Sequence, residues 1–170
     1  MSNLEDLKNN IYQQYMKKAL EYAQCAYELN EVPIGALVVL DTTDNFSNNN
    51  NYQDKYIIGA GYNQVEKLYT QSAHAEVIAL AQAGQQLKNW RLSDCWLYVT
   101  LEPCAMCMNL IVLSRIKGVI YGAQSPLFGY HLDNGLQTQL YKKDAPRIIS
   151  GICAQESADI LKKFFDKKRN

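Results

Sequence analysis

Residues 95–107, Cys-Trp-Leu-Tyr-Val-Thr-Leu-Glu-Pro-Cys-Ala-Met-Cys, join the clearest strand of this chain to a pair of cysteines. The run Trp96–Leu101 is rich in aromatic, β-branched and leucine residues, which is typical of a buried strand. Pro103 follows at once, and proline is favoured at the first position of a helix. The segment therefore predicts a strand followed directly by a helix, with Cys104 and Cys107 in the first turn of that helix.

Apolar residues on either side of this segment recur with the spacing of helices and strands. We expect helices over about residues 7–29, 73–87, 103–114 and 156–168, and strands over about 34–40, 56–62, 96–101, 119–121 and 148–152. Strands and helices alternate after an opening hairpin, which favours a mixed sheet with helices on both faces. The predicted fold class is α/β, in three layers.

Length and composition limit how the chain can be organised. A chain of 170 residues can bury one hydrophobic core and hardly two, so we expect a single domain over residues 1–170. Hydrophobic residues make up 48% and charged residues 20%, which is ordinary for a globular protein. Residues 41–55 contain a run of asparagines and few apolar side chains, and we interpret them as a loop insertion.

Cysteine usage and charge narrow the function further. The chain has 5 cysteines, an odd number, and no signal-peptide pattern, which argues against a disulfide framework. No apolar run approaches the length of a membrane span, so we expect a cytoplasmic protein without a membrane partner. The formal net charge is zero, so binding of nucleic acid would depend on a local basic patch such as the lysines and arginine of residues 162–169.

Two short fragments carry the candidate chemistry: residues 74–76, His-Ala-Glu, and residues 103–107, Pro-Cys-Ala-Met-Cys. Cysteines three residues apart on a helix can reach one ion, and a helix start favours their thiolate form. A Cys-x-x-Cys pair can also be redox-active or half of a structural zinc site. Structural zinc takes four protein ligands, and the only histidine in the sequence besides His74 is His131. The small number of candidate ligands favours three protein ligands and an open fourth position on the metal, as in catalytic zinc sites.

Glu76 is the candidate catalytic residue. It lies two positions after His74 on an expected helix, so its side chain points elsewhere and can lie beside a metal without binding it. A carboxylate beside a zinc-activated water can take a proton from it and return that proton to a leaving group. The alternative is an ordinary solvent-facing glutamate, which the neighbouring metal pattern makes the weaker interpretation.

His-x-Glu followed by Pro-Cys-x-x-Cys resembles the signature of zinc-dependent nucleobase deaminases. Further stretches, residues 31–36, 61–63, 97–107, 113–116, 121–123 and the Phe-Phe pair 164–165 before a basic tail, are similar to bacterial tRNA-specific adenosine deaminases, which make inosine at the wobble base. The resemblance covers about residues 15–169 apart from the asparagine-rich segment. It implies a cytidine deaminase-like fold, a central five-stranded mixed sheet, one Zn²⁺ per chain on His74, Cys104 and Cys107, and proton transfer by Glu76.

The same resemblance implies substrate-binding residues and partners. Asn63 would contact the purine, the Ala75 amide would lie against the base, and Glu31, Val32 and Pro33 would line the pocket entrance, with Ser125 and Phe165 as further contacts. The family usually has a carboxylate at the position of Ser125, and often Asp-Pro where this chain has Thr70 and Gln71. The implied partners are a tRNA anticodon stem-loop and a second copy of the chain in a homodimer.

Two other functions fit the same metal pattern. A zinc deaminase of a free base or nucleotide, such as guanine or cytosine, would use the same site and agrees with the zero net charge. A zinc-stabilised binding module without activity would keep the ligands but would have no need of Glu76. Incubating the zinc-loaded protein with an anticodon stem-loop and with free bases separates these functions.

Overall fold

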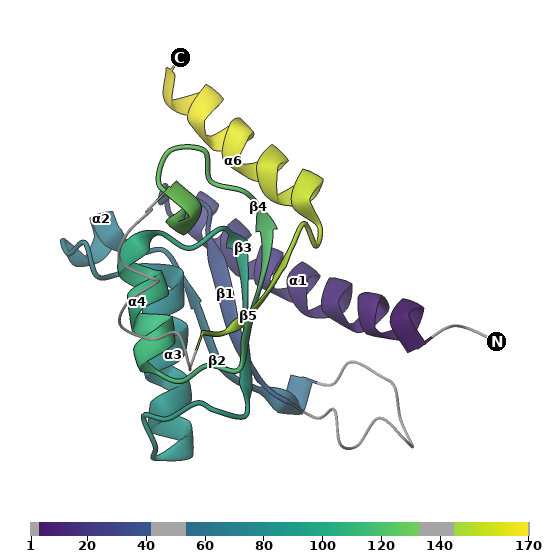
Figure 1. Cartoon of the computed structure of the whole chain (residues 1–170). Coiled ribbons are helices and arrows are strands. Elements are labelled where there is room, and N and C mark those ends of the chain that lie inside the picture. Colours follow the sequence, from purple (N-terminus) through teal and green to yellow (C-terminus); the bar gives the residue numbers. More distant parts are fainter. Residues whose placement is uncertain (1–3, 42–53, 133–144, 170) are drawn as a thin grey trace.

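The computed structural model describes residues 4–41, 54–132 and 145–169 (Figure 1). The helices are α1 (Leu4–Glu28), α2 (Val65–Leu68), α3 (Ala75–Leu87), α4 (Ala105–Leu113) and α6 (Ala154–Arg169), and short 3-10 helices η2 and η3 cover Asp54–Tyr56 and Tyr130–Leu132. The strands are β1 (Gly35–Leu40), β2 (Ile57–Tyr62), β3 (Cys95–Leu101), β4 (Gly118–Ala123) and β5 (Arg147–Ser150). Apart from its ends, the insertion predicted at 41–55 lies outside the described residues.

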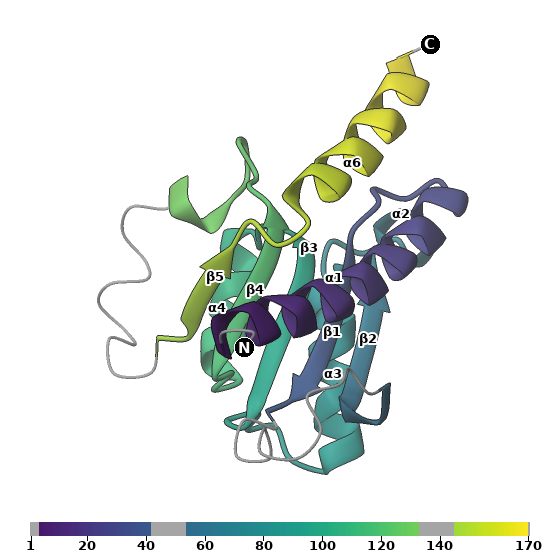
Figure 2. The same cartoon turned by 90° about the vertical axis from the view of Figure 1, so that its right-hand side faces the viewer.

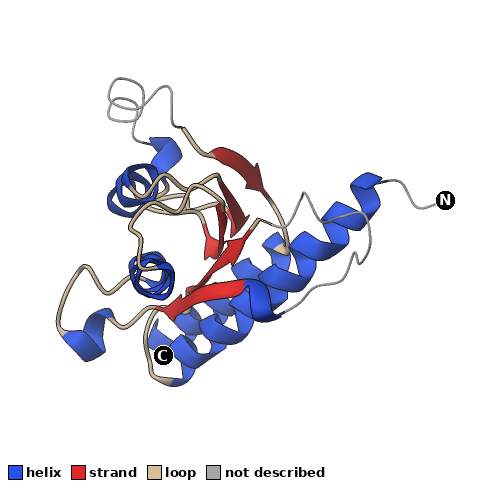
Figure 3. Cartoon of the chain, turned by 90° about the horizontal axis from the view of Figure 1, so that it is seen from below, coloured by secondary structure: helices blue, strands red, loops and turns tan. Residues whose placement is uncertain are grey.

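The strands form one mixed sheet in the order β2-β1-β3-β4-β5. β1 runs antiparallel to both β2 and β3, whereas β3, β4 and β5 are parallel to one another. Helices α3 and α4 cover one face of the sheet, and α1 and α6 cover the other (Figures 2 and 3). The three-layer α/β fold with a central five-stranded mixed sheet is therefore confirmed.

The core consists of two layers separated by the sheet. Alternate residues of β3 enter opposite layers: Leu97 and Val99 pack with residues of α3 and α4, and Trp96 and Tyr98 pack with residues of α1. β3 is buried along almost its whole length, as expected for a strand covered on both faces. Because β3 is covered by helices on both faces, its residues are largely apolar without alternation, and this is the continuous apolar run seen in the sequence.

The carboxyl ends of β2, β3 and β4 lie at the same edge of the sheet. Ala36, at the start of β1, pairs with Gly61 on one side and Val99 on the other, and Leu101 of β3 pairs with Ala123 of β4. Helices α3 and α4 begin at this edge (Figure 1). In open α/β sheets, ligands usually bind outside the carboxyl ends of the strands, so this edge is the natural place for a site.

Glycine lets α3 approach the sheet closely at this edge. A Cβ placed on Gly61 would lie 2.6 Å from the carbonyl oxygen of Ala75, and one on Gly59 would lie 2.2 Å from that of Ala79. Real Cβ atoms do not come so close to backbone oxygen, so any other residue would push the helix away. The two glycines therefore fix the height of the first turn of α3 above β2.

The structure corrects the expected helix starts. Pro103 was predicted to be the first helical residue, and this is wrong: α4 begins at Ala105, and Cys104 is its N-cap with an extended backbone (φ −74°, ψ 170°). Similarly, α3 begins at Ala75 and His74 is its N-cap. Cys104 therefore lies at the boundary of the helix instead of within its first turn.

The last strand and one short helix also differ from the sequence-based expectation. β5 ends at Ser150 instead of continuing to 152, because Gly151 has a positive φ of 87° and the amides of Gly151 and Ile152 both donate to the same carbonyl, that of Tyr121. The short helix α2 was not predicted. Within the described part of the chain, no helix is both long and apolar enough to cross a membrane.

Candidate active site

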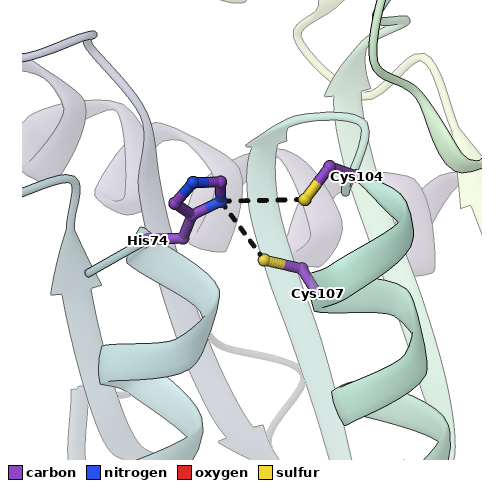
Figure 4. A group of neighbouring side chains, drawn as sticks. All are labelled: His74, Cys104 and Cys107. Carbon is purple, nitrogen blue, oxygen red and sulfur yellow. Dashed lines mark hydrogen bonds between the residues drawn. The ribbon is translucent and has the colours of Figure 1, made fainter. Parts of the chain in front are cut away.

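The two helix starts bring together the three predicted metal ligands (Figure 4). Nδ1 of His74 lies 3.4 Å from Sγ of Cys107 and 3.7 Å from Sγ of Cys104. All three potential ligand atoms lie within 4.8 Å of one another. His74 and Cys104 are the N-caps of α3 and α4, and Cys107 lies in the first turn of α4. Residues that are 30 positions apart in the sequence thus face each other as one cluster.

Hydrogen bonds within the cluster determine its charge. Hydrogen bonds from Cys107 and His74 lower the pKa of Cys104 to about 4, although burial acts in the opposite direction. The hydrogen bond to Cys104, followed by burial, raises the pKa of Cys107, and the hydrogen bond to Cys104 raises that of His74. The first turns of both helices also present amides that favour negative charge. A thiolate therefore forms readily at Cys104 and is stabilised by donors that a cation can replace.

This donor set fits a zinc ion. Zinc is bound in proteins by thiolate sulfur and imidazole nitrogen, and three protein ligands leave a fourth position for chemistry. Among the described residues, the cluster contains His74, Cys104 and Cys107 and no fourth candidate ligand. His131 does not join it: Nδ1 of His131 lies 2.7 Å from a carboxylate oxygen of Glu102. The residues match a catalytic zinc site better than a structural one.

Glu76 lies in the first turn of α3 and is almost completely buried, with 3% of its surface exposed. Its oxygen Oε2 has no hydrogen-bond partner within the described ranges, while the carboxyl group also interacts with the Cys107 thiol. Burial raises the pKa of Glu76, although the nearby His74 acts to lower it. A buried carboxylate oxygen without a partner is costly unless something else uses it, so its position beside the cluster points to proton transfer.

Asn63 and Ala75 are directly connected. The Ala75 amide donates to Oδ1 of Asn63 at 2.9 Å, and Asn63 is buried. The side-chain carbonyl of Asn63 thus orients the first turn of α3 next to His74. Because its oxygen has this partner, the group that Asn63 could offer to a base is its amino group.

Glu31 has a partner that the sequence did not indicate. Its two carboxylate oxygens accept hydrogen bonds from the amides of Glu66 (3.2 Å) and Lys67 (2.7 Å) and so hold α2 in place. Glu31 and Pro33 are buried and Val32 is half-buried. These residues connect the start of β1 to the segment that follows Asn63.

Ser125 lies in the loop that follows β4, residues 124–132, called here the 124–132 loop. Its amide donates to Oε2 of Glu102 at 3.0 Å, and its hydroxyl accepts from the Phe128 amide at 3.3 Å. Sequence reasoning did not single out Glu102. The sequence did offer a signal for it, because Glu102 is an acidic residue between a buried strand and the metal motif. A carboxylate is rarely buried unless it has partners, so this position indicates a hydrogen-bonded glutamate.

Phe165 lies on α6, which extends past the sheet edge where α3 and α4 begin (Figures 1 and 2). Its side chain is 47% exposed, whereas its neighbour Phe164 is buried and packs edge-on against Tyr27 of α1. Lys163 and Lys167 lie 5.5 and 5.6 Å from the centre of the same tyrosine ring. α6 therefore carries both an exposed aromatic side chain and several lysines.

Comparisons with known proteins identify the family of this chain. The MafB19-like deaminase family matches residues 10–169. A curated relative, the tRNA-specific adenosine deaminase of Buchnera aphidicola subsp. Schizaphis graminum, is 40% identical over 166 residues, which cover 96% of this chain and 99% of the relative. The resemblance to this group that the sequence indicated is confirmed.

Two solved structures of deaminases are also similar to this chain. A chain from studies of A-to-I editing by tRNA:A34 deaminases at the wobble position is 37% identical, with a TM-score of 0.72, over 86% of this chain and 98% of that one. A guanine deaminase from Bacillus subtilis is 33% identical, with a TM-score of 0.54, over 65% of this chain and 63% of that one. Several curated relatives at 34–40% identity are tRNA-specific adenosine deaminases, and the chain belongs to the MafB19-like deaminase family.

Proposed function

We propose that this protein is a zinc-dependent hydrolase that converts adenosine to inosine at the wobble position of a tRNA anticodon. The observation that carries the proposal is the buried Oε2 of Glu76, which has no hydrogen-bond partner within the described ranges, beside a cluster of one histidine and two cysteines. The similarity to tRNA-specific adenosine deaminases over nearly the whole chain supports the choice of substrate.

His74, Cys104 and Cys107 would hold one zinc ion per chain. When bound, zinc lowers the pKa of a water molecule and so supplies a nucleophile at neutral pH. The reaction consumes one water and one adenosine and releases inosine and ammonia. The bond between the ring carbon and the exocyclic amine nitrogen breaks, and the oxygen of water takes the place of that nitrogen.

Glu76 would move the protons. Its carboxylate would accept one proton from the attacking water and deliver it to the base, and would then carry the second proton of that water to the departing amine, so that ammonia can leave. The raised pKa of Glu76 suits both steps, because a group that gives up and regains a proton works best when its pKa is near the working pH. Burial also keeps bulk water from competing for that proton.

The surrounding residues would bind the base and the RNA. The amino group of Asn63 would donate to the purine, with the Ala75 amide beside the base, and Glu31, Val32, Pro33 and Ser125 would shape the entrance. A target base is most easily taken from a single-stranded loop, and α6, with Phe165 and its lysines, would contact the flanking RNA. We further propose a single-domain cytoplasmic enzyme that works as a homodimer on a tRNA anticodon stem-loop.

A second function retains support: deamination of a free base such as guanine. The zero net charge, the missing carboxylate at Ser125 and the likeness to a guanine deaminase favour it. It differs from the first proposal only in the substrate, since the cluster and Glu76 would act in the same way.

The test is to incubate the zinc-loaded protein with an anticodon stem-loop that carries adenosine at the wobble position, and separately with guanine, cytosine and adenosine. We expect inosine in the stem-loop and little turnover of the free bases. Deleting residues 167–170 should weaken RNA deamination and flatten its salt dependence, by about one unit of slope for each lost phosphate contact. Efficient turnover of guanine with no inosine in the RNA would contradict the proposal.

A further inference from the structure

The 124–132 loop folds around a single buried carboxylate, that of Glu102. Glu102 is 2% exposed, and its oxygens accept hydrogen bonds from the Ser125 amide (3.0 Å) and the His131 amide (3.2 Å). The His131 ring adds a further contact, with Nδ1 at 2.7 Å from Oε1 of Glu102. Glu102 thus holds both ends of the loop at once.

The same carboxylate belongs to the turn that carries a metal ligand. Glu102 lies two residues before Cys104, Cys104 forms an isolated β-bridge with Gly129, and the Tyr130 amide donates to the carbonyl of Pro103 at 2.9 Å. A Cβ on Gly129 would lie 2.3 Å from Oε2 of Glu102, so any other residue here would displace the Glu102 carboxylate. The loop and the ligand turn therefore form one connected unit.

Phe128 is presented to solvent by this unit. Its side chain is 75% exposed, its amide donates to the Ser125 hydroxyl at 3.3 Å, and the next residue is the glycine that pairs with Cys104. An exposed aromatic ring would ordinarily be costly and poorly ordered. Here the backbone is held on both sides of it, one residue from the contact with the metal-ligand turn.

We propose that Phe128 is a stacking surface for the RNA base next to the target adenosine, and that His131 is a positioning residue that holds Phe128 there through Glu102. The inference rests on the proposed function, because a flanking base exists only if the substrate is RNA. A base that leaves its stack exposes the faces of its neighbours, and an aromatic side chain can replace the lost stacking. A ring on a backbone that is already ordered loses less freedom on binding.

Leu127 supplies a matched control, because it is a neighbouring side chain with the same 75% exposure but no aromatic face. Phe128→Ala should raise the KM for the stem-loop by roughly 5- to 100-fold, the range found when a stacking aromatic is removed. Phe128→Tyr should restore the KM, and Leu127→Ala should change it less than about twofold. In a stem-loop with an abasic residue at the stacked position, Phe128→Ala should have no further effect.

His131 is tested through Phe128. His131→Ala should raise the KM for the stem-loop by less than Phe128→Ala and leave zinc content and kcat unchanged. His131→Asn should restore part of the loss, since an amide group can also donate to Glu102. The double variant should be no worse than Phe128→Ala alone, because the histidine acts through the phenylalanine. Additive effects would overturn the positioning role.

The remaining outcomes separate this inference from the proposed function. If the wild-type protein deaminates the stem-loop but Phe128→Ala and Leu127→Ala have equal KM values, or if the effect persists with abasic residues on both flanks, the stacking role is wrong and the proposed function stands. A shift from dimer to monomer in sedimentation of Phe128→Ala would place the ring in a subunit contact and also overturn the inference. If the wild type makes no inosine in RNA, both fail.

Discussion

The starts of α3 and α4 face each other across the cluster, yet they contribute different groups. The start of α4 supplies two candidate thiol ligands, Cys104 and Cys107. The start of α3 supplies one candidate ligand, His74, and two residues later Glu76, whose buried oxygen points to proton transfer. The hydrogen bond from the Ala75 amide to Asn63 also lies on the α3 side.

This difference assigns separate tasks to the two sides. Changes on the α4 side should remove the metal and activity together, because both of its side chains in the cluster are proposed ligands. Changes on the α3 side, other than at His74, should impair turnover or substrate binding while the metal stays bound.

Cys104→Ala should abolish activity and reduce the zinc content to near zero, because the two remaining protein ligands would bind zinc too weakly to retain it. Stability should fall as well, since metal binding to the folded state supports folding. Elemental analysis and thermal unfolding measure both effects. Cys25→Ala, at an exposed cysteine of α1, is the matched control and should keep zinc and activity. A Cys104 variant that keeps both would show that the thiol is not a ligand.

Glu76→Gln should lower kcat by about 10²- to 10⁴-fold, the usual contribution of a general acid–base group. Zinc content should stay at about one per chain, because glutamine keeps the shape of the side chain but cannot take up a proton. Kinetics and elemental analysis on the same preparation test this, with Glu156→Gln on α6 as a control. Loss of zinc in the Glu76 variant would mean that its carboxylate binds the metal.

Asn63→Asp separates the two tasks of this side chain. Aspartate keeps an oxygen for the Ala75 amide but lacks the amino group proposed to reach the purine, so KM should rise by roughly tenfold with zinc and thermal stability retained. Asn63→Ala should in addition leave the Ala75 amide without its partner, at a cost of about 1–3 kcal/mol in the free energy of unfolding. Equal KM values for Asn63→Asp and wild type would limit Asn63 to a structural role.

Glu31→Gln should have the smallest effect. Glutamine offers one acceptor and one donor to two amides that both need an acceptor, so the start of α2 should loosen. Hydrogen exchange at the amides of Glu66 and Lys67 should become faster, and the melting temperature should fall by about 2–4 °C for each kcal/mol lost. Unchanged exchange would show that the carboxylate does not hold α2.

Much of the fold could be predicted from the sequence because the signals are local. The buried run that became β3 and the helical spacing seen over 73–87 each reflect the faces those segments bury. The three residues of the cluster could also be singled out from the sequence, because their spacing and the chemistry of cysteine and histidine limit what the motif can do, and the structure brings them together. Pro103 misled because its preference for the first helical position is a tendency that the extended N-cap at Cys104 overrode.

What the sequence could not show depends on contacts between distant residues. α2 is only four residues long, and it is held by Glu31, which lies 35 positions before Glu66. His131 stood out only as a possible fourth ligand, and its partner Glu102 lies 29 positions away. Periodicity carries no information about such pairs, so the loops around the cluster could be understood only in three dimensions.

X-ray absorption spectroscopy of the zinc-loaded protein tests most directly whether the cluster is a catalytic centre. The structure predicts two sulfur neighbours at about 2.3 Å and two nitrogen or oxygen neighbours at about 2.0–2.1 Å, only one of them an imidazole. The spectrum of His131→Ala should be the same, because His131 pairs with Glu102. Two imidazoles in the wild-type spectrum, one of them lost in His131→Ala, would make this a closed structural site and contradict the proposed chemistry.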